Sequence, residues 1–308
     1  MGAKPFLKWA GGKGQLLKSL SGFFPKALAD GTVTDYYEPF MGGGAMFFHV
    51  MQNYPVKSAW LMDANEELVL LYNVVRRDVE PLVERLSQLE RDYLKLDGDK
   101  RQARFLKVRA ALNKARPGMD FKKYSQEWIE RASQLIFLNK TCYNGLFRVN
   151  RDGGFNTPFG RYARPTIADI GNLRAASSLL AKATIRLSDF GDLATRKGHP
   201  RQNAFIYYDP PYRPLSRTAS FTSYSRFAFG DPEQERLARM FKALDRKGVW
   251  QMLSNSDPKN TDPADEFFET AYSDYRKTFW RVPASRAINS NAKGRGRINE
   301  IVITNYQP

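Results

Sequence analysis

Three short segments, each leading into an acidic residue or a turn, constrain the fold of this chain more than any other feature. They span residues 34–38, 58–62 and 204–208 and are followed by Pro39, Asp63 and Asp209. Such short runs are typical of parallel strands that are buried on both faces of a sheet. Further strands are expected at residues 183–187, 249–253 and 298–304, and helical periodicity covers residues 15–24, 44–52, 66–76 and 232–244. Strands that alternate with helices predict an open α/β sheet.

The middle of the chain differs in composition from the segments on either side. Residues 78–139 are rich in Glu, Arg, Lys and Leu, and apolar side chains such as Leu82, Leu86 and Leu89 recur at helical spacing. Residues 140–164 are instead rich in Asn, Gly, Arg and aromatic residues, which indicates a hairpin or an ordered loop. We therefore predict that residues 1–77 and 165–308 form one domain. Residues 78–164 are expected to form an inserted, mainly helical domain.

The charge of the chain favours a polyanionic partner. Lys and Arg total 48 against 32 Asp and Glu, which gives a formal net charge of +16. Nucleic acid is the leading candidate, because basic side chains that neutralise phosphates release condensed counterions. A basic chain without any polyanionic partner would show the same excess, so charge alone leaves both interpretations open.

The rare residue types exclude several kinds of site. Cys142 is the only cysteine, which rules out an internal disulfide and a CxxC motif. The only histidines, His49 and His199, cannot form a zinc site by themselves, and we expect no metal. No apolar run approaches the roughly 18 residues that a membrane span requires. We expect a cytoplasmic setting without a membrane segment.

A glycine-rich turn follows the first predicted strand. It reads Glu38-Pro39-Phe40-Met41-Gly42-Gly43-Gly44, and glycines allow a ligand to approach the main chain closely. Asp63 ends the next strand about 20 residues further on, the usual distance for a carboxylate that binds ribose hydroxyls. The pair fits a dinucleotide or S-adenosylmethionine (SAM), and the lack of GxGxxG counts against the dinucleotide. The alternative is a glycine turn with an unrelated aspartate.

The tetrapeptide Asp209-Pro210-Pro211-Tyr212 follows the strand at 204–208. Prolines fix φ and can therefore hold the Asp209 carboxylate and the Pro210 carbonyl in place as two acceptors. Adenine N6 needs such acceptors, because its lone pair is delocalised into the ring and its two N–H groups must be oriented. Tyr212 can stack on the base once the base has been flipped out of a duplex. The alternative is a proline turn after a core strand.

Five blocks of this chain resemble, in order, the Dam-type (D12 class) N6-adenine-specific DNA methyltransferases. They are KPFLKWAGGK at 4–13, EPFMGGGAMFF at 38–48, DANEELVLLY at 63–72, NKTCYNGLFRVNRDGGFNTPFGRY at 139–162 and YYDPPY at 207–212. The segments LSNS at 253–256 and INEIVITNY at 298–306 also look like this family, so the resemblance covers nearly the whole chain.

The resemblance implies a Rossmann-like SAM-dependent methyltransferase domain with an inserted, mainly helical target-recognition domain, whose DNA-reading loop spans about residues 140–164. The implied activity is methyl transfer from SAM to adenine N6 in double-stranded DNA, commonly at GATC, with base flipping and S-adenosylhomocysteine as the product. No obligate protein partner is implied, and the setting is bacterial or phage-type, with a restriction-modification role among those open.

The resemblance also implies roles for individual residues. Lys13 is expected near the methionine carboxylate of the cofactor, Asp63 on the ribose, and Asp189 with Phe190 on the cofactor adenine. The catalytic residues are expected to be Asp209, Pro210, Pro211 and Tyr212. The cofactor pocket is expected to be lined by Trp9, Ala10, Gly11, Lys13, Glu38, Phe40, Gly42, Gly44, Asp63, Asp189, Phe190 and Asp209.

The fourth block, residues 139–162, matches family positions that contact target bases, and we call it the recognition block. Arg148 can read guanine through a bidentate pair, Asn144 offers amide groups to a base, and Tyr143 can fill the space left by a flipped adenine. A phosphate contact by Arg148 and simple loop packing by Tyr143 are the alternatives. The full expected DNA-binding set is Lys8, Tyr143, Asn144, Leu146, Arg148, Pro158 and Tyr162.

The residues of this chain count against four other functions. A cytosine-C5 methyltransferase needs a nucleophilic cysteine, whereas Cys142 lies in Thr-Cys-Tyr within the recognition block and is expected to be a packing residue. Methylation of a protein glutamine or of RNA is chemically close, but the charge and the recognition block count against it. A DNA-binding protein that has lost catalysis is disfavoured by the intact tetrapeptide. An NAD oxidoreductase is disfavoured by the missing GxGxxG.

Overall fold

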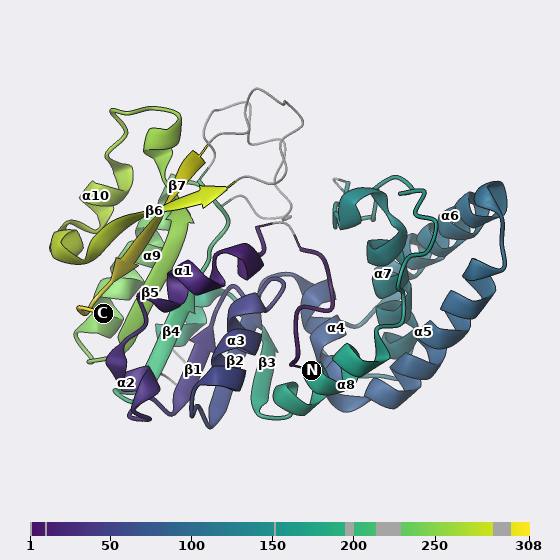
Figure 1. The fold of residues 1–308 in the computed structure, drawn as a ribbon, viewed down its shortest axis with the longest axis horizontal. Coiled ribbons are helices and arrows are strands. Elements are labelled where there is room, and N and C mark those ends of the chain that lie inside the picture. The colour runs from purple at the N-terminus through teal and green to yellow at the C-terminus, as the bar shows by residue number, and fades with distance from the viewer. Residues whose placement is uncertain (1, 10, 151, 195–199, 214–228, 286–296) are drawn as a thin grey trace.

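A computed structural model describes residues 2–9, 11–150, 152–194, 200–213, 229–285 and 297–308. The strands of these residues form one seven-stranded sheet in the order β3-β2-β1-β4-β5-β7-β6 (Figure 1). They span β1 Asp35–Glu38, β2 Ser58–Asp63, β3 Ala183–Leu187, β4 Ala204–Tyr208, β5 Trp250–Ser256, β6 Phe279–Ser285 and β7 Arg297–Thr304. The pairs among β1 to β5 are parallel, while β7 runs antiparallel to both β5 and β6. The predicted α/β class is confirmed.

The helices largely match the predicted periodicity. They are α1 Leu17–Ser21, α2 Lys26–Ala29, α3 Ala45–Asn53, α4 Glu66–Arg77, α5 Val79–Leu94, α6 Gly98–Ala115, α7 Glu127–Thr141, α8 Ile170–Leu180, α9 Asp231–Asp245 and α10 Phe267–Ala271. Short 3₁₀ turns are η1 Lys13–Gln15, η2 Arg116–Gly118, η3 Tyr143–Gly145, η4 Phe190–Ala194, η6 Pro258–Asn260 and η7 Ser273–Thr278. The helix expected at 15–24 is instead a 3₁₀ turn followed by the short α1. No helix among the described residues is long and apolar enough to cross a membrane.

Helices cover both faces of the sheet, as a parallel sheet requires. Alternate side chains of β4 point to opposite faces because successive residues of a strand do so. Phe205 and Tyr207 join a buried cluster with residues of α1, α3, α4 and α8. Ile206 and Tyr208 join a second cluster with residues of α9 and α10. The central strands are therefore buried on both faces.

The segment 78–164 contributes the helices α5, α6 and α7, which Figure 1 shows grouped beyond the β3 edge of the sheet. The predicted apolar stripe of α5 is buried, including Leu82, Leu86 and Leu89. Residues 140–164 carry two isolated antiparallel bridges, Cys142 with Phe159 and Val149 with Phe155, around η3. The expected ordered loop thus has a partly paired backbone.

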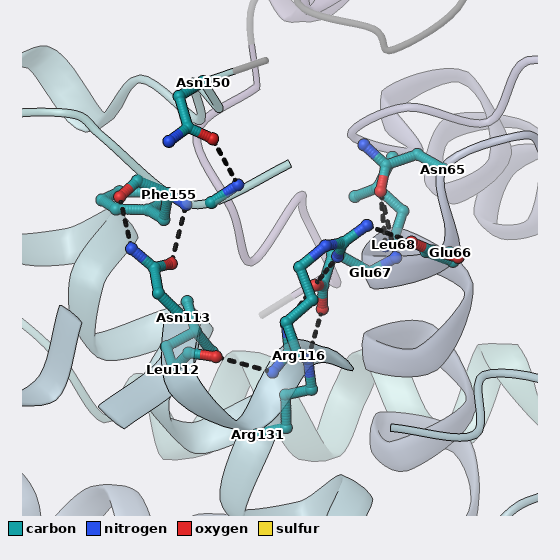
Figure 2. A network of polar contacts seen from close by, with 11 residues as sticks. Asn65, Glu66, Glu67, Leu68, Leu112, Asn113, Arg116, Arg131, Asn150 and Phe155 are labelled. Atoms are coloured by element: carbon teal, nitrogen blue, oxygen red, sulfur yellow. Dashed lines mark hydrogen bonds and ion pairs between the residues drawn. The ribbon is translucent and has the colours of Figure 1, made fainter. Parts of the chain in front are cut away.

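A buried ionic network joins α4 to these helices (Figure 2). Glu67 accepts from Arg116 Nη1 at 2.6 Å and from Arg131 Nε at 2.7 Å, and Arg116 also pairs with Glu66. Asn113, one helical turn before Arg116, holds both backbone groups of Phe155 at 2.8 and 3.0 Å. The end of α6 and the following η2 turn therefore make polar contacts with α4 on one side and with the loop at 140–164 on the other.

Candidate functional site

The order of the strands reverses between β1 and β4, and this reversal makes the carboxyl ends of these two strands the switch point of the sheet. The chain passes from β1 to β2 on one side and from β4 to β5 on the other. In open α/β sheets ligands bind at such a switch point. The glycine turn after β1 and the tetrapeptide after β4 both start at this edge, because Tyr37 pairs with Ile206 near the ends of the two strands.

The tetrapeptide forms a hydrogen-bonded cluster with Lys13 of η1. Lys13 Nζ lies 2.6 Å from Asp209 Oδ1 and 2.8 Å from the Tyr212 hydroxyl. It also lies 4.8 Å from the centre of the Tyr212 ring. The Tyr212 hydroxyl donates to Glu300 Oε1 of β7 at 2.8 Å. Elements far apart in the sequence therefore meet at the switch point.

The charges of this cluster stabilise one another. Burial raises the pKa of Asp209, and the opposing effect of the Lys13 ammonium only partly offsets this. Burial alone would lower the pKa of Lys13, but Asp209, Tyr207 and Glu300 outweigh burial and raise it. Lys13 therefore remains an ammonium, and its contact with Asp209 favours the carboxylate as a hydrogen-bond acceptor.

Lys13 is held by three acceptors of the protein. Its ammonium donates to Asp209, to the Tyr212 hydroxyl and to the Gly11 carbonyl, the last at 3.3 Å, and its contact with a cofactor carboxylate stays a prediction. An ammonium has three donors, so a further anion would have to replace one of these acceptors. The long contact to Gly11 is the weakest of the three. Ala10, the neighbour of Gly11, lies outside the described residues.

The glycine turn is closely packed against aromatic side chains. Gly42 and Gly44 have φ of +46° and +67°, which favours glycine at both positions. A Cβ atom on Gly44 would lie 2.6 Å from the Tyr72 hydroxyl, and one on Gly43 would lie 3.1 Å from Trp9 Cβ. Trp9, expected in the cofactor pocket, therefore lies directly against the turn.

Asp63 and Glu38 are the two carboxylates beside this turn. Asp63 accepts from the backbone N–H of Gly42 at 3.0 Å and of Asn65 at 2.8 Å. Burial nevertheless raises the pKa of Asp63 to about 6. Glu38 accepts from the Tyr36 hydroxyl at 2.9 Å, and burial raises its pKa well above the usual value. Asp63 thus stands at the end of β2, where a ribose-binding carboxylate is expected.

The residues expected around the cofactor adenine form an aromatic group with an arginine. Phe190 lies 5.4 Å from Phe40, measured between ring centres. Arg236 of α9 lies 3.9 Å from the centre of the Phe190 ring. Its guanidinium also binds both carboxylate oxygens of Asp189, at 2.6 and 2.8 Å, which lowers the pKa of Asp189. The sequence reasoning placed Asp189 and Phe190 together but did not identify Arg236.

The recognition block lies close to the N-terminal segment that carries Lys8. Asn139 accepts from Lys8 N at 2.9 Å and donates to the carbonyls of Lys8 and Gly145 at 2.9 and 2.8 Å. Lys8 Nζ lies 5.6 Å from the centre of the Tyr162 ring. The ring of Trp9 stacks on Phe147 at 5.1 Å between centres. The candidate cofactor pocket and the candidate DNA-reading loop are therefore neighbours.

Within this block the expected base-reading residues differ in how firmly they are held. Tyr143 is 56% exposed. This is the largest exposed fraction of any large hydrophobic side chain among the described residues. Its backbone N–H donates to the Pro158 carbonyl at 2.8 Å, and Asn144 follows with a φ of +56°. Arg148 Nε donates to Asn156 Oδ1 at 2.8 Å. The carbonyl of the half-buried Leu146 accepts from Thr157 at 2.7 Å.

Cys142 has the buried position that was expected of a packing residue. Its side chain is fully buried, and its thiol contacts the carbonyls of Asn139 and Leu146. Burial raises the pKa of the thiol to about 11. A thiol in this state is a poor nucleophile, because the thiolate is the reactive form.

Three residues near the tetrapeptide were missed by the sequence reasoning. Gln234 of α9 is fully buried and donates to the Pro211 carbonyl at 3.0 Å. Ser254 of β5 lies 2.7 Å from the Tyr207 hydroxyl and bonds to Asp209. Glu300 of β7 accepts from the Tyr212 hydroxyl. Each of the three is a polar residue within an otherwise apolar strand or helix face, and this pattern in the sequence could have identified them.

Comparisons with known proteins agree with this geometry. The profile of the D12 class N6 adenine-specific DNA methyltransferase family matches residues 9–287. The chain is 43% identical over 307 residues to the type II methyltransferase M.MjaIII of Methanocaldococcus jannaschii, which covers 99% of this chain and 100% of that protein. It is 33% identical over 308 residues to the type II methyltransferase M1.LlaDCHI of Lactococcus lactis subsp. cremoris, and the match covers 98% of this chain and 95% of that protein. It is 30% identical over 308 residues to the DNA adenine methylase of Escherichia coli, and the match covers 99% of this chain and 96% of that protein. The chain therefore belongs to the D12 class of N6 adenine-specific DNA methyltransferases.

Proposed function

We propose that this chain transfers a methyl group from SAM to N6 of an adenine that has been flipped out of duplex DNA, with GATC as the target sequence. The observation that carries the proposal is the meeting of the glycine turn, Lys13 and the tetrapeptide at the switch point of the sheet. This arrangement places hydrogen-bond acceptors for an amino group at the same edge of the sheet as Asp63, which suits a ribose.

The residues around the glycine turn fit SAM by their chemistry. Added Cβ atoms at Gly43 and Gly44 would crowd Trp9 and Tyr72, so the turn can take this close-packed path only with glycine. Asp63 supplies a half-buried carboxylate suited to ribose hydroxyls, and Phe40 with Phe190 supplies aromatic surface for the adenine. When bound, SAM would supply an electrophilic methyl group.

The side chains would then orient the target amino group. We propose that the Asp209 carboxylate and the Pro210 carbonyl accept the two N6–H bonds and so turn the nitrogen lone pair toward the methyl donor. Lys13 would keep Asp209 in its accepting form despite burial. Pro211, held through its carbonyl by Gln234, would fix the backbone of the tetrapeptide, and Tyr212 would stack on the base.

We propose that residues 78–164 form the target-recognition domain, with the DNA-reading loop at about 140–164. The packing of Lys8 and Trp9 against this segment supports the assignment, since it joins a cofactor residue to the loop. The exposure of Tyr143 suits a side chain that fills the space left by a flipped base. Arg148 is proposed to read guanine, with its Nε held by Asn156.

The direct test is transfer of labelled methyl from SAM to duplexes that differ at one base pair. We expect transfer to GATC duplexes and a large loss for each single substitution. Absence of transfer to any adenine-containing duplex would refute the enzymatic proposal, and equal transfer to all of them would refute the target sequence. Asp209→Ala is expected to abolish transfer while S-adenosylhomocysteine still binds in calorimetry.

A second test separates base reading from phosphate contact at Arg148. Arg148→Ala should relax discrimination at one position of the target, because a bidentate contact to guanine discriminates by about 1–3 kcal/mol. The matched control is Arg239→Ala on α9, since the Arg239 side chain is 70% exposed. A uniform loss of affinity on all duplexes would assign Arg148 to a phosphate instead.

A further inference from the structure

Glu300 lies on the sheet face that carries the site. It pairs with Ser256 of β5 and with Val282 of β6, in the strand that runs antiparallel to both. Its neighbour two residues along, Val302, belongs to the same buried cluster as Tyr207. Because side chains alternate along a strand, Glu300 projects to that face too. Its exposed fraction is 7%, low for a glutamate.

The hydrogen bonds around Glu300 have only one possible direction. The Lys13 ammonium can only donate, so the Tyr212 oxygen must accept from it at 2.8 Å. The single phenolic proton must then point to Glu300 Oε1, also at 2.8 Å. Glu300 is therefore the acceptor at the end of a chain that begins at Asp209 and passes through Lys13 and Tyr212.

This chain fixes the ring of Tyr212. The hydroxyl is held by a donor on one side and an acceptor on the other, while the ring lies over the Lys13 ammonium at 4.8 Å from its centre. Hydrogen bonds to charged groups are about twice as strong as neutral ones, and both bonds to this hydroxyl are of that kind. Without Glu300 the Tyr212 hydroxyl would lose this charged acceptor.

We propose that Glu300 is a positioning residue for methyl transfer, which accepts the Tyr212 hydroxyl proton and thereby fixes the ring that stacks on the target adenine. The inference rests on the proposed function, since it assigns that stacking role to Tyr212. Glu300 also supplies a negative charge to Lys13 and helps to raise its pKa. Misplacing a reacting group by about 1 Å can cost on the order of 100-fold in rate.

The test measures the single-turnover rate of methyl transfer with saturating SAM and DNA. Glu300→Leu, which removes both the acceptor and the charge, should slow transfer about 10- to 100-fold. Glu300→Gln keeps a carbonyl acceptor and should recover part of that loss. The matched control is Glu235→Gln on α9. The Glu235 side chain is 56% exposed and forms an ion pair with Arg239, and the variant should transfer methyl groups at the wild-type rate.

A double-mutant cycle with Tyr212→Phe decides between positioning and general destabilisation. If Glu300 acts through the hydroxyl, Glu300→Leu should cause little further loss once that hydroxyl is absent. Calorimetry should show an S-adenosylhomocysteine Kd within about threefold of the wild type in every variant. Should Glu300→Leu fail to fold, as judged by thermal unfolding, the isosteric Glu300→Gln takes its place in the cycle.

The outcomes separate this inference from the proposed function. An equal loss from Glu300→Leu in the wild-type and Tyr212→Phe backgrounds would overturn the positioning role, as would wild-type rates in all Glu300 variants. Both results leave methyl transfer by the wild type intact. A wild type that transfers no methyl group to any duplex would instead refute the proposed function itself.

Discussion

Asp63 shows how a single half-buried carboxyl group can have opposite effects on stability and on binding. Burial raises its pKa to about 6, although backbone N–H groups of Gly42 and Asn65 donate to it. Between about pH 4 and pH 6 the folded protein thus binds a proton that the unfolded chain has lost. This group therefore lowers the free energy of unfolding as pH rises through that window. Binding of ribose hydroxyls by the carboxylate should instead improve over the same window.

The first prediction follows from this sign. The affinity for S-adenosylhomocysteine should rise roughly tenfold between pH 5 and pH 7, because about one-tenth of Asp63 is ionised one pH unit below its pKa. Asp63→Asn should bind more weakly at pH 7 and should lose most of the pH dependence. Calorimetric titrations at several pH values measure both. An unchanged pH profile in Asp63→Asn would exclude Asp63 as the titrating group.

Arg236 supports the second prediction at this scale. It binds both oxygens of Asp189 and lies over the Phe190 ring, so its removal should loosen the pocket for the cofactor adenine. Arg236→Ala should weaken S-adenosylhomocysteine binding about 2- to 10-fold. The free energy of unfolding should change by less than about 1 kcal/mol, because the pair is solvent-exposed. Arg239→Ala, on the same helix, is the control. Equal affinities of the two variants would remove Arg236 from the site.

At the scale of elements, six of the seven described strands were predicted and the edge strand β6 was not. The segments predicted at 183–187 and 204–208 coincide with β3 and β4, because their patterns reflect burial in the sheet. The strand β6 was missed, since Arg281 and Pro283 interrupt its apolar pattern. As the last strand of the sheet that the described residues form, β6 pairs there only with β7 and so tolerates both residues.

The candidate site was predictable only where residues lie close in sequence. The tetrapeptide and the glycine turn are local, so their composition identified them. The contact of Lys13 with Asp209 was not predicted, because Asp209 is 196 positions away and only the topology of the sheet brings it near. Glu300 and Arg236 were missed for the same reason, since each reaches the site from a separate strand or helix.

The third prediction concerns the network that joins α4 to α7. Glu67 is buried against Arg116 and Arg131, and removal of one partner leaves buried charge without compensation. Glu67→Gln should lower the free energy of unfolding by about 3–5 kcal/mol. Glu66→Gln, which removes the more exposed partner of Arg116, should cost about 1 kcal/mol or less. Urea denaturation measures both, and equal losses would contradict the assigned difference in burial.

For the molecule as a whole, the net charge of +16 has to be reconciled with the base-specific binding that we propose. Contacts to phosphates depend on salt and are blind to sequence, whereas contacts to base edges carry the discrimination. The proposed recognition loop contains both kinds of side chain. The two contributions should therefore separate when salt is varied.

The fourth prediction uses that separation. If the protein neutralises six phosphates, log affinity for DNA should fall with log salt at a slope of about −5, since each phosphate contributes about −0.9. A duplex with one altered base pair in GATC should give a parallel line displaced by about 1–3 kcal/mol. The affinity for S-adenosylhomocysteine should change by less than about threefold between 50 and 200 mM salt, because this zwitterion has no net charge at neutral pH and its binding releases few counterions. Fluorescence anisotropy with labelled duplexes measures the two lines. Lines that converge at high salt would mean that discrimination comes from phosphate contacts, and a flat line would mean that the excess charge has no part in binding DNA.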